Sequence, residues 1–93
     1  MLTQNEMDML DTFIRGYLQL AQEQTKRTDR ALGAQAFGFL KNPHMKLQAI
    51  KGGPNKKPQQ LRLADVLNLC EALGVSWQDA IRSAIAAVKS TKR

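Results

Sequence analysis

The chain has 93 residues, of which 43% are hydrophobic and 24% are charged, with a net charge of +6 and a single cysteine, Cys70. A chain of this length predicts one domain, residues 1–93, that buries about 60 to 65% of the surface it exposes when unfolded. No apolar run approaches the roughly 20 residues of a membrane-spanning helix, and the acidic start MLTQNEMDML is unlike a signal peptide. We therefore expect a soluble cytoplasmic protein, with Cys70 as a small buried side chain in a reducing compartment.

The positive charge is concentrated in the middle third of the chain. Residues 1–25 contain one base and four acids, residues 26–62 contain nine bases and one acid, and residues 63–93 contain four bases and three acids. The three net charges are therefore −3, +8 and +1. A basic block of this kind predicts a polyanionic partner, because lysines and arginines that neutralise phosphates release counterions. A surface selected only for solubility is the alternative.

The first predicted helix covers residues 3–24. Thr3 and Glu6 form a capping box, in which the hydroxyl accepts from the third helical amide and the carboxylate reaches back to the cap. Apolar residues then recur at the three- and four-residue spacing of one helix face: Met7, Leu10, Phe13, Ile14, Tyr17, Leu18 and Ala21. A second, shorter helix over residues 28–37 begins at Thr28 and Asp29, since threonine is a favoured cap.

The third predicted helix covers residues 42–51, within the stretch KNPHMKLQAIKGG. Asn42 is a favoured cap, and Pro43 suits the first helical position because its ring already holds φ near the helical value. Gly-Gly-Pro ends the helix. At helical spacing, His44, Gln48 and Lys51 fall within about 60° of one another and form an outward stripe, whereas Leu47 and Ile50 face the core.

Two further helices are predicted over residues 61–73 and 76–90. Ser76 and Asp79 resemble a second capping box. The inward residues of the first of these helices are Leu63, Val66, Leu67, Cys70 and Leu73, and those of the second are Trp77, Ile81, Ile85 and Val88. No stretch alternates in the manner of a β-strand, so the predicted fold class is all-α, a five-helix compact domain.

Catalysis and metal or cofactor binding have little support in the sequence. One histidine, one cysteine and scattered acids do not form a nucleophile, base and orienting set, and His44 has no second ligand at metal-binding spacing. Phosphate-binding glycine motifs are absent from the sequence. We therefore expect a protein that is not an enzyme and that needs no metal or cofactor.

Double-stranded DNA is the polyanion that best fits the third helix. A short helix that enters the major groove needs polar side chains for base edges and nearby cations for phosphates. Asn42, His44 and Gln48 can donate and accept hydrogen bonds, and Lys41, Lys46 and Lys51 can pair with phosphate or guanine. A role for Asn42 as a helix cap alone and a functionless solvated face are the alternatives.

The stretch LRLADVLNLCEALGVSWQDAI, residues 61–81, resembles the end of Cro/CI-type (XRE-like) helix-turn-helix domains. LQAIKGG resembles the end of the recognition helix of that family, with Leu47 and Ile50 at core positions and Gly53 at its terminating glycine. Residues 28–81 follow the family's order of elements, which implies a lambda-repressor-like DNA-binding fold. The connection GFLKNP is a few residues longer than the tight turn usual in the family.

The resemblance also implies residue roles. In the family the start of the second helix lies against a backbone phosphate, and the first half of the third helix reads the major groove. On this chain, that makes Thr28, Asp29 and Arg30 neighbours of a phosphate. The base-reading residues become His44, Lys46 and Gln48. The other implied contacts to the DNA backbone are Lys41, Asn42, Lys51, Lys56 and Lys57.

The predicted function is that of a sequence-specific transcriptional regulator, a repressor from a compact or mobile genome such as a phage or plasmid. It is expected to bind a palindromic operator as a homodimer, with half-sites about 34 Å apart. Trp77, Ile81, Ile85 and Val88 are the expected dimer interface. Two alternatives stay open: a helix-turn-helix antitoxin that also binds a toxin protein, and a sequence-neutral architectural binder of nucleic acid.

Overall fold

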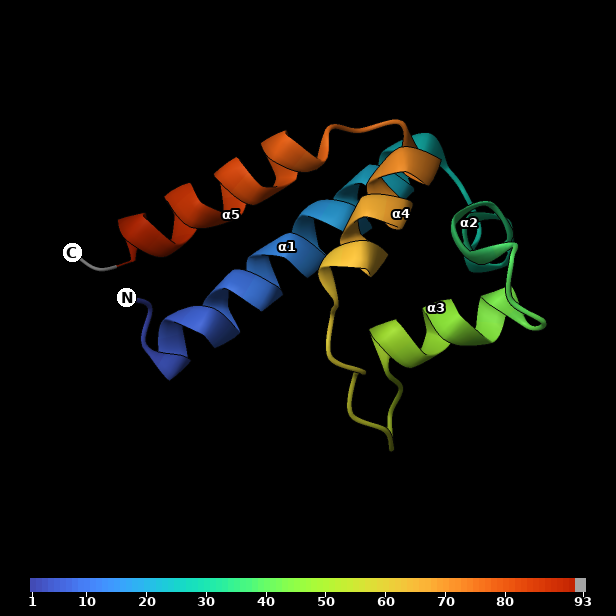
Figure 1. The fold of residues 1–93 in the computed structure, drawn as a ribbon, viewed down its shortest axis with the longest axis horizontal. Helices are drawn as coiled ribbons and strands as arrows, with labels where there is room; N and C mark the ends of the chain where they lie inside the picture. The colour runs from blue at the N-terminus through green and yellow to red at the C-terminus, as the bar shows by residue number, and fades with distance from the viewer. Residues whose placement is uncertain (92–93) are drawn as a thin grey trace.

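The computed structural model describes residues 1–91, which form five helices (Figure 1). These are α1 (Gln4–Thr25), α2 (Asp29–Phe37), α3 (Pro43–Lys51), α4 (Leu63–Leu73) and α5 (Trp77–Ser90). The described residues contain no strand, although an isolated antiparallel bridge joins Gly53 to Lys56 in the loop after α3. The all-α, five-helix prediction is confirmed, and each predicted helix limit lies within two residues of the observed one. No helix in residues 1–91 is long and apolar enough to cross a lipid bilayer.

The long helix α1 starts at the predicted capping box. The Glu6 amide donates to Thr3 Oγ1 at 3.1 Å, and the Thr3 amide donates to Glu6 Oε1 at 3.2 Å. Helix α5 runs antiparallel to α1, so that both chain ends lie at the same end of the molecule (Figure 1). Its buried residues Ala80, Ala84 and Val88 are mostly small. Small side chains let the two helix backbones approach each other closely.

The core lies between α2, α3, α4 and the C-terminal half of α1, and it includes Ala80 of α5. Its most buried large side chains are Phe37, Leu32, Leu47 and Cys70. The predictions that Leu47 and Ile50 face inward and that Cys70 is buried are confirmed. Burial raises the pKa of the Cys70 thiol, so this side chain stays neutral at pH 7.

Helices α2 and α3 touch through Gly33, which is buried. A Cβ atom added to Gly33 would lie 2.9 Å from His44 Cα and 3.1 Å from the carbonyl oxygen of Pro43. The first turn of α3 therefore lies directly on the backbone of α2. Glycine is the residue that permits so close an approach.

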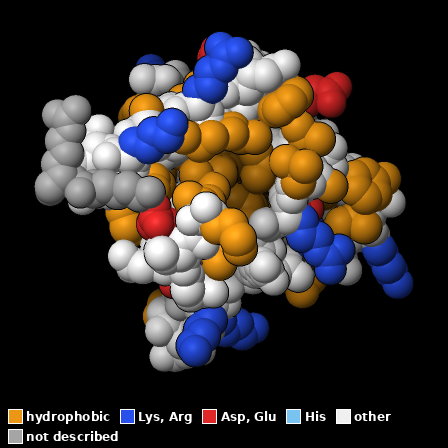
Figure 2. All heavy atoms as spheres, turned by 60° about the vertical axis from the view of Figure 1, so that its left-hand side comes forward, with side chains coloured by type: hydrophobic (Ala, Val, Ile, Leu, Met, Phe, Trp, Pro, Cys, Tyr) orange, Lys and Arg blue, Asp and Glu red, His pale blue; other side chains and the backbone are white. Residues whose placement is uncertain are grey.

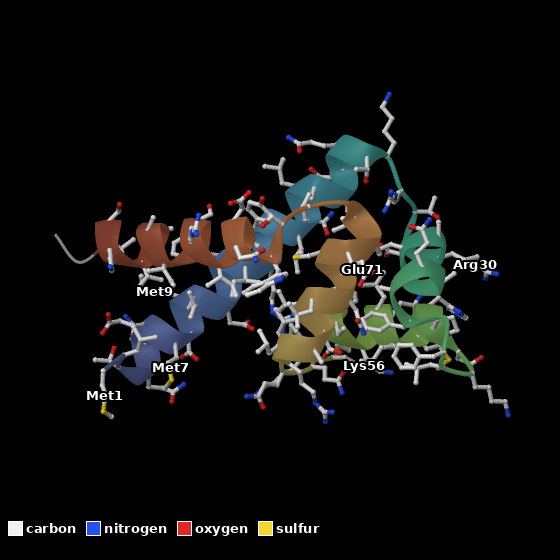
Figure 3. All side chains as sticks on the ribbon, turned by 45° about the horizontal axis from the view of Figure 1, so that its top comes forward. Met1, Met7, Met9, Arg30, Lys56 and Glu71 are labelled. Carbon is white, nitrogen blue, oxygen red and sulfur yellow. The ribbon has the colours of Figure 1, made fainter. Side chains whose placement is uncertain are left out.

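Several side chains predicted to face inward are instead exposed. Leu63, at the first residue of α4, is 64% exposed, and Trp77 and Ile85 of α5 are 43% and 39% exposed. The α5 stripe of Trp77, Ile81 and Ile85 lies beside the stripe that packs on α1. The inward prediction for α5 is therefore confirmed at Val88, partly right at the half-buried Ile81, and wrong at Trp77 and Ile85. Near the N-terminus Met7 is 45% exposed as well, because α1 and α5 extend beyond the other helices (Figures 1 and 3).

The end of the molecule that carries the two chain termini has a face rich in apolar surface (Figure 2). In the space-filling view, hydrophobic side chains gather around a hollow on the face that comes forward from the side of the two chain ends (Figure 2). The molecule is elongated in the same direction, with extents of 43 × 29 × 20 Å.

Candidate nucleic-acid interface

The exposed face of α3 consists of Met45, Gln48 and Ala49. These positions lie opposite the buried Leu47 and Ile50, as a rotation of about 100° per residue requires. The outward stripe predicted from the sequence is therefore only partly right. Gln48 is exposed, but His44 and Lys51 lie at the edges of the buried face and are half-buried.

The start of α3 has a simple cap. Pro43 occupies the first helical position, as predicted, and the Met45 amide donates to the Asn42 carbonyl at 3.1 Å. The Asn42 side chain makes no capping hydrogen bond, so the prediction that it caps α3 is wrong at the side-chain level. Asn42 and Lys41 are both exposed in the connection before α3.

The half-buried side chain of Lys51 is held against the protein by residues of α1 and α2. Its Nζ atom lies 2.6 Å from Gln22 Oε1 and 2.6 Å from Asp29 Oδ1. The Gln22 amide also donates to Asp29 Oδ1 at 2.7 Å, and the hydrogen bonds from Gln22 and then Lys51 lower the pKa of the Asp29 carboxyl. Lys51 therefore ties the end of α3 to α1 and α2 and has its charge balanced by Asp29.

Lys46 is likewise turned toward the protein. Its Nζ atom donates to Gln59 Oε1 at 3.1 Å and lies 3.6 Å from the carboxylate of Asp65, a buried residue of α4. Burying a carboxylate without a nearby cation is costly. The position of Lys46 is thus explained by the charge of Asp65, and its ammonium group does not share the outward face of Gln48.

The loop after α3 folds back along that helix. The Gln59 amide donates to the Ala49 carbonyl at 2.7 Å. Gly52 has a φ of +75°, and a Cβ atom there would lie 2.8 Å from the backbone nitrogen of Pro58, so glycine suits this turn on both grounds. Arg15 of α1 donates to the carbonyls of Ile50 and Gln59 and fixes the same loop from the other side.

A groove results between the outward face of α3 and this loop. Its lining consists of Met45, Gln48, Ala49, Gly52, Gly53, Lys56, Lys57 and Gln59. The α3 wall carries the amide of Gln48 between Met45 and Ala49. The loop wall carries the exposed Lys56 and Lys57. The structure therefore brings together Gln48, Lys56 and Lys57, three of the residues that the sequence singled out.

The chain segment that forms the groove contains basic residues and no acidic ones. Residues 30–64 contain seven lysines and arginines and no acid. Lys46 and Lys51 pair with acids from outside this segment. The other five are exposed and form no ion pair within residues 1–91: Arg30, Lys41, Lys56, Lys57 and Arg62. Such cations are available to an external anion.

The start of α2 combines a cap with an exposed cation. Thr28 Oγ1 accepts from the Ala31 amide at 3.1 Å, as expected for an N-cap. Asp29 is engaged by Lys51, whereas Arg30 extends away from the body of the protein (Figure 3). Of the three residues at this helix start, Arg30 is therefore the one whose side chain is available to a phosphate.

Sequence reasoning missed Met45, Ala49 and Arg62. Centring the helical wheel of α3 opposite Leu47 and Ile50, rather than on the polar side chains, finds Met45 and Ala49. Among residues 1–91, no three histidine, cysteine, aspartate or glutamate side chains lie close enough to hold a metal ion.

Comparison of the chain with protein-family models, with curated proteins and with solved structures finds no match.

Proposed function

We propose that this chain is a sequence-specific DNA-binding transcriptional regulator in which α2 and α3 act as a helix-turn-helix. The observation that carries the proposal is the outward face of α3, where the exposed amide of Gln48 lies beside Lys56 and Lys57 in an acid-free segment. A short helix with a polar outward face and flanking cations suits the major groove. The resemblance of residues 28–81 to Cro/CI-type domains supports the same assignment.

Each part of the groove has a role in this proposal. Gln48 reads a base edge, since glutamine pairs with adenine through two hydrogen bonds, and Met45 and Ala49 contact thymine methyl groups. His44, at the first turn of α3, is a second reading residue. The exposed cations contact the DNA backbone: Arg30, Lys41, Lys56, Lys57 and Arg62.

Lys46 and Lys51 receive a different role. Both are engaged with acids of the protein, so we assign them to holding α3 in place rather than to reading bases or binding phosphate. Thr28 acts mainly as the cap of α2. Asn42, exposed and without a capping bond, remains free to reach a phosphate.

A matched pair of variants tests the proposal in mobility-shift titrations. Gln48→Ala is expected to weaken binding to the preferred operator by about 1 to 3 kcal/mol and to relax the preference at one base pair. Lys57→Ala is expected to weaken all sequences alike and to reduce the salt slope by about one unit.

A different result for Gln48→Ala would exclude the reading of base pairs by α3. If Gln48→Ala bound its operator as tightly as the wild type while Lys57→Ala was weakened, the protein would be a sequence-neutral binder of nucleic acid. Such a protein would show a steep salt dependence without a specificity ratio.

The apolar end of α1 and α5 favours one second candidate function. A helix-turn-helix antitoxin binds a toxin protein as well as its operator, and the exposed Met7 and Ile85 offer apolar surface to such a partner. A homodimer that acts as a repressor in the cytoplasm uses the same surface for a second copy. Copurification of a different protein with the tagged chain would favour the antitoxin.

A further inference from the structure

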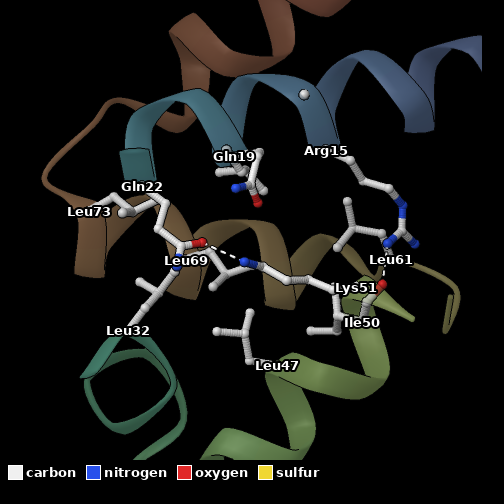
Figure 4. A pocket seen from close by; sticks show the side chains of 12 residues that line it. Arg15, Gln19, Gln22, Leu32, Leu47, Ile50, Lys51, Leu61, Leu69 and Leu73 are labelled. Carbon is white, nitrogen blue, oxygen red and sulfur yellow. Dashed lines mark hydrogen bonds between the residues drawn. The ribbon is translucent and has the colours of Figure 1, made fainter. Parts of the chain in front are cut away.

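A cavity of about 320 Å³, open to solvent on one side, lies between α1, α2, α3 and α4 (Figure 4). Its walls are aliphatic and come from four helices, with Leu18 on α1, Leu32 on α2, Leu47 and Ile50 on α3, and Leu69 on α4. Because it is open on that side, the space is a surface pocket with an aliphatic floor rather than an enclosed void. Apolar pockets of about this size and larger are typical small-molecule sites.

The mouth of the cavity is polar but carries no unpaired charge. Lys51 reaches across it to Gln22, as the dashed line in Figure 4 shows, and its ammonium group is also paired with Asp29. Arg15 is paired with Asp11 at 2.7 Å and donates to the carbonyl of Ile50. An anionic ligand would have to displace these partners, whereas an uncharged ligand leaves all of them in place.

Gly16 is a second feature of this pocket, because it has no side chain at the pocket edge. It lines the cavity from the middle of the 22-residue helix α1, where glycine weakens a helix relative to alanine. A Cβ atom at this position would meet no atom within 4 Å, so packing within the protein does not require glycine. The position of Gly16 therefore leaves open space at the edge of the pocket.

We propose that this cavity binds a small uncharged molecule, mostly hydrocarbon, of about the size of two fused rings. A dry cavity of about 150 Å³ takes up benzene, so a space about twice as large accommodates two rings. One polar group of the ligand faces the Gln19 amide at the mouth, and the rest contacts the leucine side chains. This binding does not depend on any interaction with DNA.

Ligand binding is expected to influence α3, because Leu47, Ile50 and Lys51 of that helix all line the cavity. This second step rests on the proposed DNA-binding function. A ligand that changes the affinity for DNA must itself be bound with an affinity that depends on DNA, since the coupling is reciprocal. The cavity would then act as an effector site beneath the reading helix.

The test uses indole and 1-naphthol as probes with the full chain and without DNA. Calorimetric titration of the wild type is expected to show saturable binding, and methyl resonances of Leu47 and Leu69 are expected to shift. Gly16→Leu should abolish both effects, because the new side chain fills the mouth. Gln24→Leu, which adds the same side chain at an exposed position of α1 outside the cavity, should bind like the wild type.

Absence of saturable binding of either probe to the wild type would overturn the proposal, as would equal binding by Gly16→Leu. The effector role has a separate readout, the DNA affinity of the wild type with and without saturating indole. Unchanged DNA affinity with indole bound would overturn the effector role and leave the binding site in place. No binding to any DNA, with indole binding intact, would instead count against the proposed function.

Discussion

The side chain of Lys51 joins three helices through two hydrogen bonds of 2.6 Å. Its partners, Gln22 and Asp29, lie more than twenty positions earlier in the chain. Sequence periodicity places Lys51 correctly at the end of a helix, but it carries no information on partners so distant. Lys51, which the sequence predicts to contact a phosphate, forms an internal ion pair that positions α3.

This ion pair has a predictable pH dependence at the residue scale. Because the pKa of Asp29 is lowered in the folded protein, its stabilising effect is complete above the ordinary carboxylate pKa of about 4 and is lost as the pH falls through the folded value. Asp29→Asn should lower the free energy of unfolding at pH 7 by at most about 1 kcal/mol, since the pair is partly exposed.

Urea unfolding of the wild type and Asp29→Asn at pH 7 and pH 3 measures this difference. The two proteins should differ less at pH 3 than at pH 7. A difference of the same size at both pH values would show that the carboxylate charge does not stabilise the fold.

At the scale of the elements, much of the fold can be predicted from the sequence. The capping box at Thr3 and Glu6, the proline at the start of α3 and the apolar spacing within each helix are local signals, and they place all five helices. The exposed face of each helix depends on which neighbours cover it. Leu63 and Trp77 have the spacing of core residues but lie where no other helix covers them.

The candidate site could likewise be predicted only in part, because local signals place some of its residues and contacts between helices place the others. Gln48, Lys56 and Lys57 are exposed and line one groove because α3 is anchored by Leu47 and Ile50, which the sequence identifies. Lys46 turns inward toward Asp65 because of where α4 lies relative to α3, and the periodicity of a single helix carries no information about that.

Two helix glycines provide a matched prediction about the α2–α3 contact. Gly33→Ala should destabilise the protein by about 1 to 3 kcal/mol, because the added methyl group would overlap the backbone of α3. Gly16→Ala should instead stabilise it by about 0.5 to 1 kcal/mol, because its methyl group meets open space and alanine favours the helix. Chemical denaturation of both variants tests the pair. Equal effects of the two substitutions would mean that α2 and α3 do not pack at Gly33.

At the scale of the whole molecule, the apolar end formed by α1 and α5 bears on the proposed homodimer. Val88 is buried against α1 in the single chain, so it is unavailable to a second copy, although it was expected in the interface. Trp77, Ile81 and Ile85 remain candidates, since they lie on the neighbouring face of α5.

Sedimentation velocity with two charge-introducing variants tests the interface. The wild type should sediment as a dimer and Ile85→Glu as a monomer, because a carboxylate cannot be buried there without a partner. Ser83→Glu, which places the same charge on the exposed opposite side of α5, should remain dimeric. A dimer that persists unchanged in Ile85→Glu would exclude this face.

If the outward face of α3 reads DNA sequence, selection from a random pool of DNA duplexes will reveal the preferred site. Repeated rounds of binding and amplification at fixed salt should enrich a (pseudo)palindromic motif with half-sites about 34 Å apart. The enriched duplex should bind roughly 10³-fold or more tightly than a scrambled one. A pool that stays random after selection, or duplexes that all bind equally, would contradict the account.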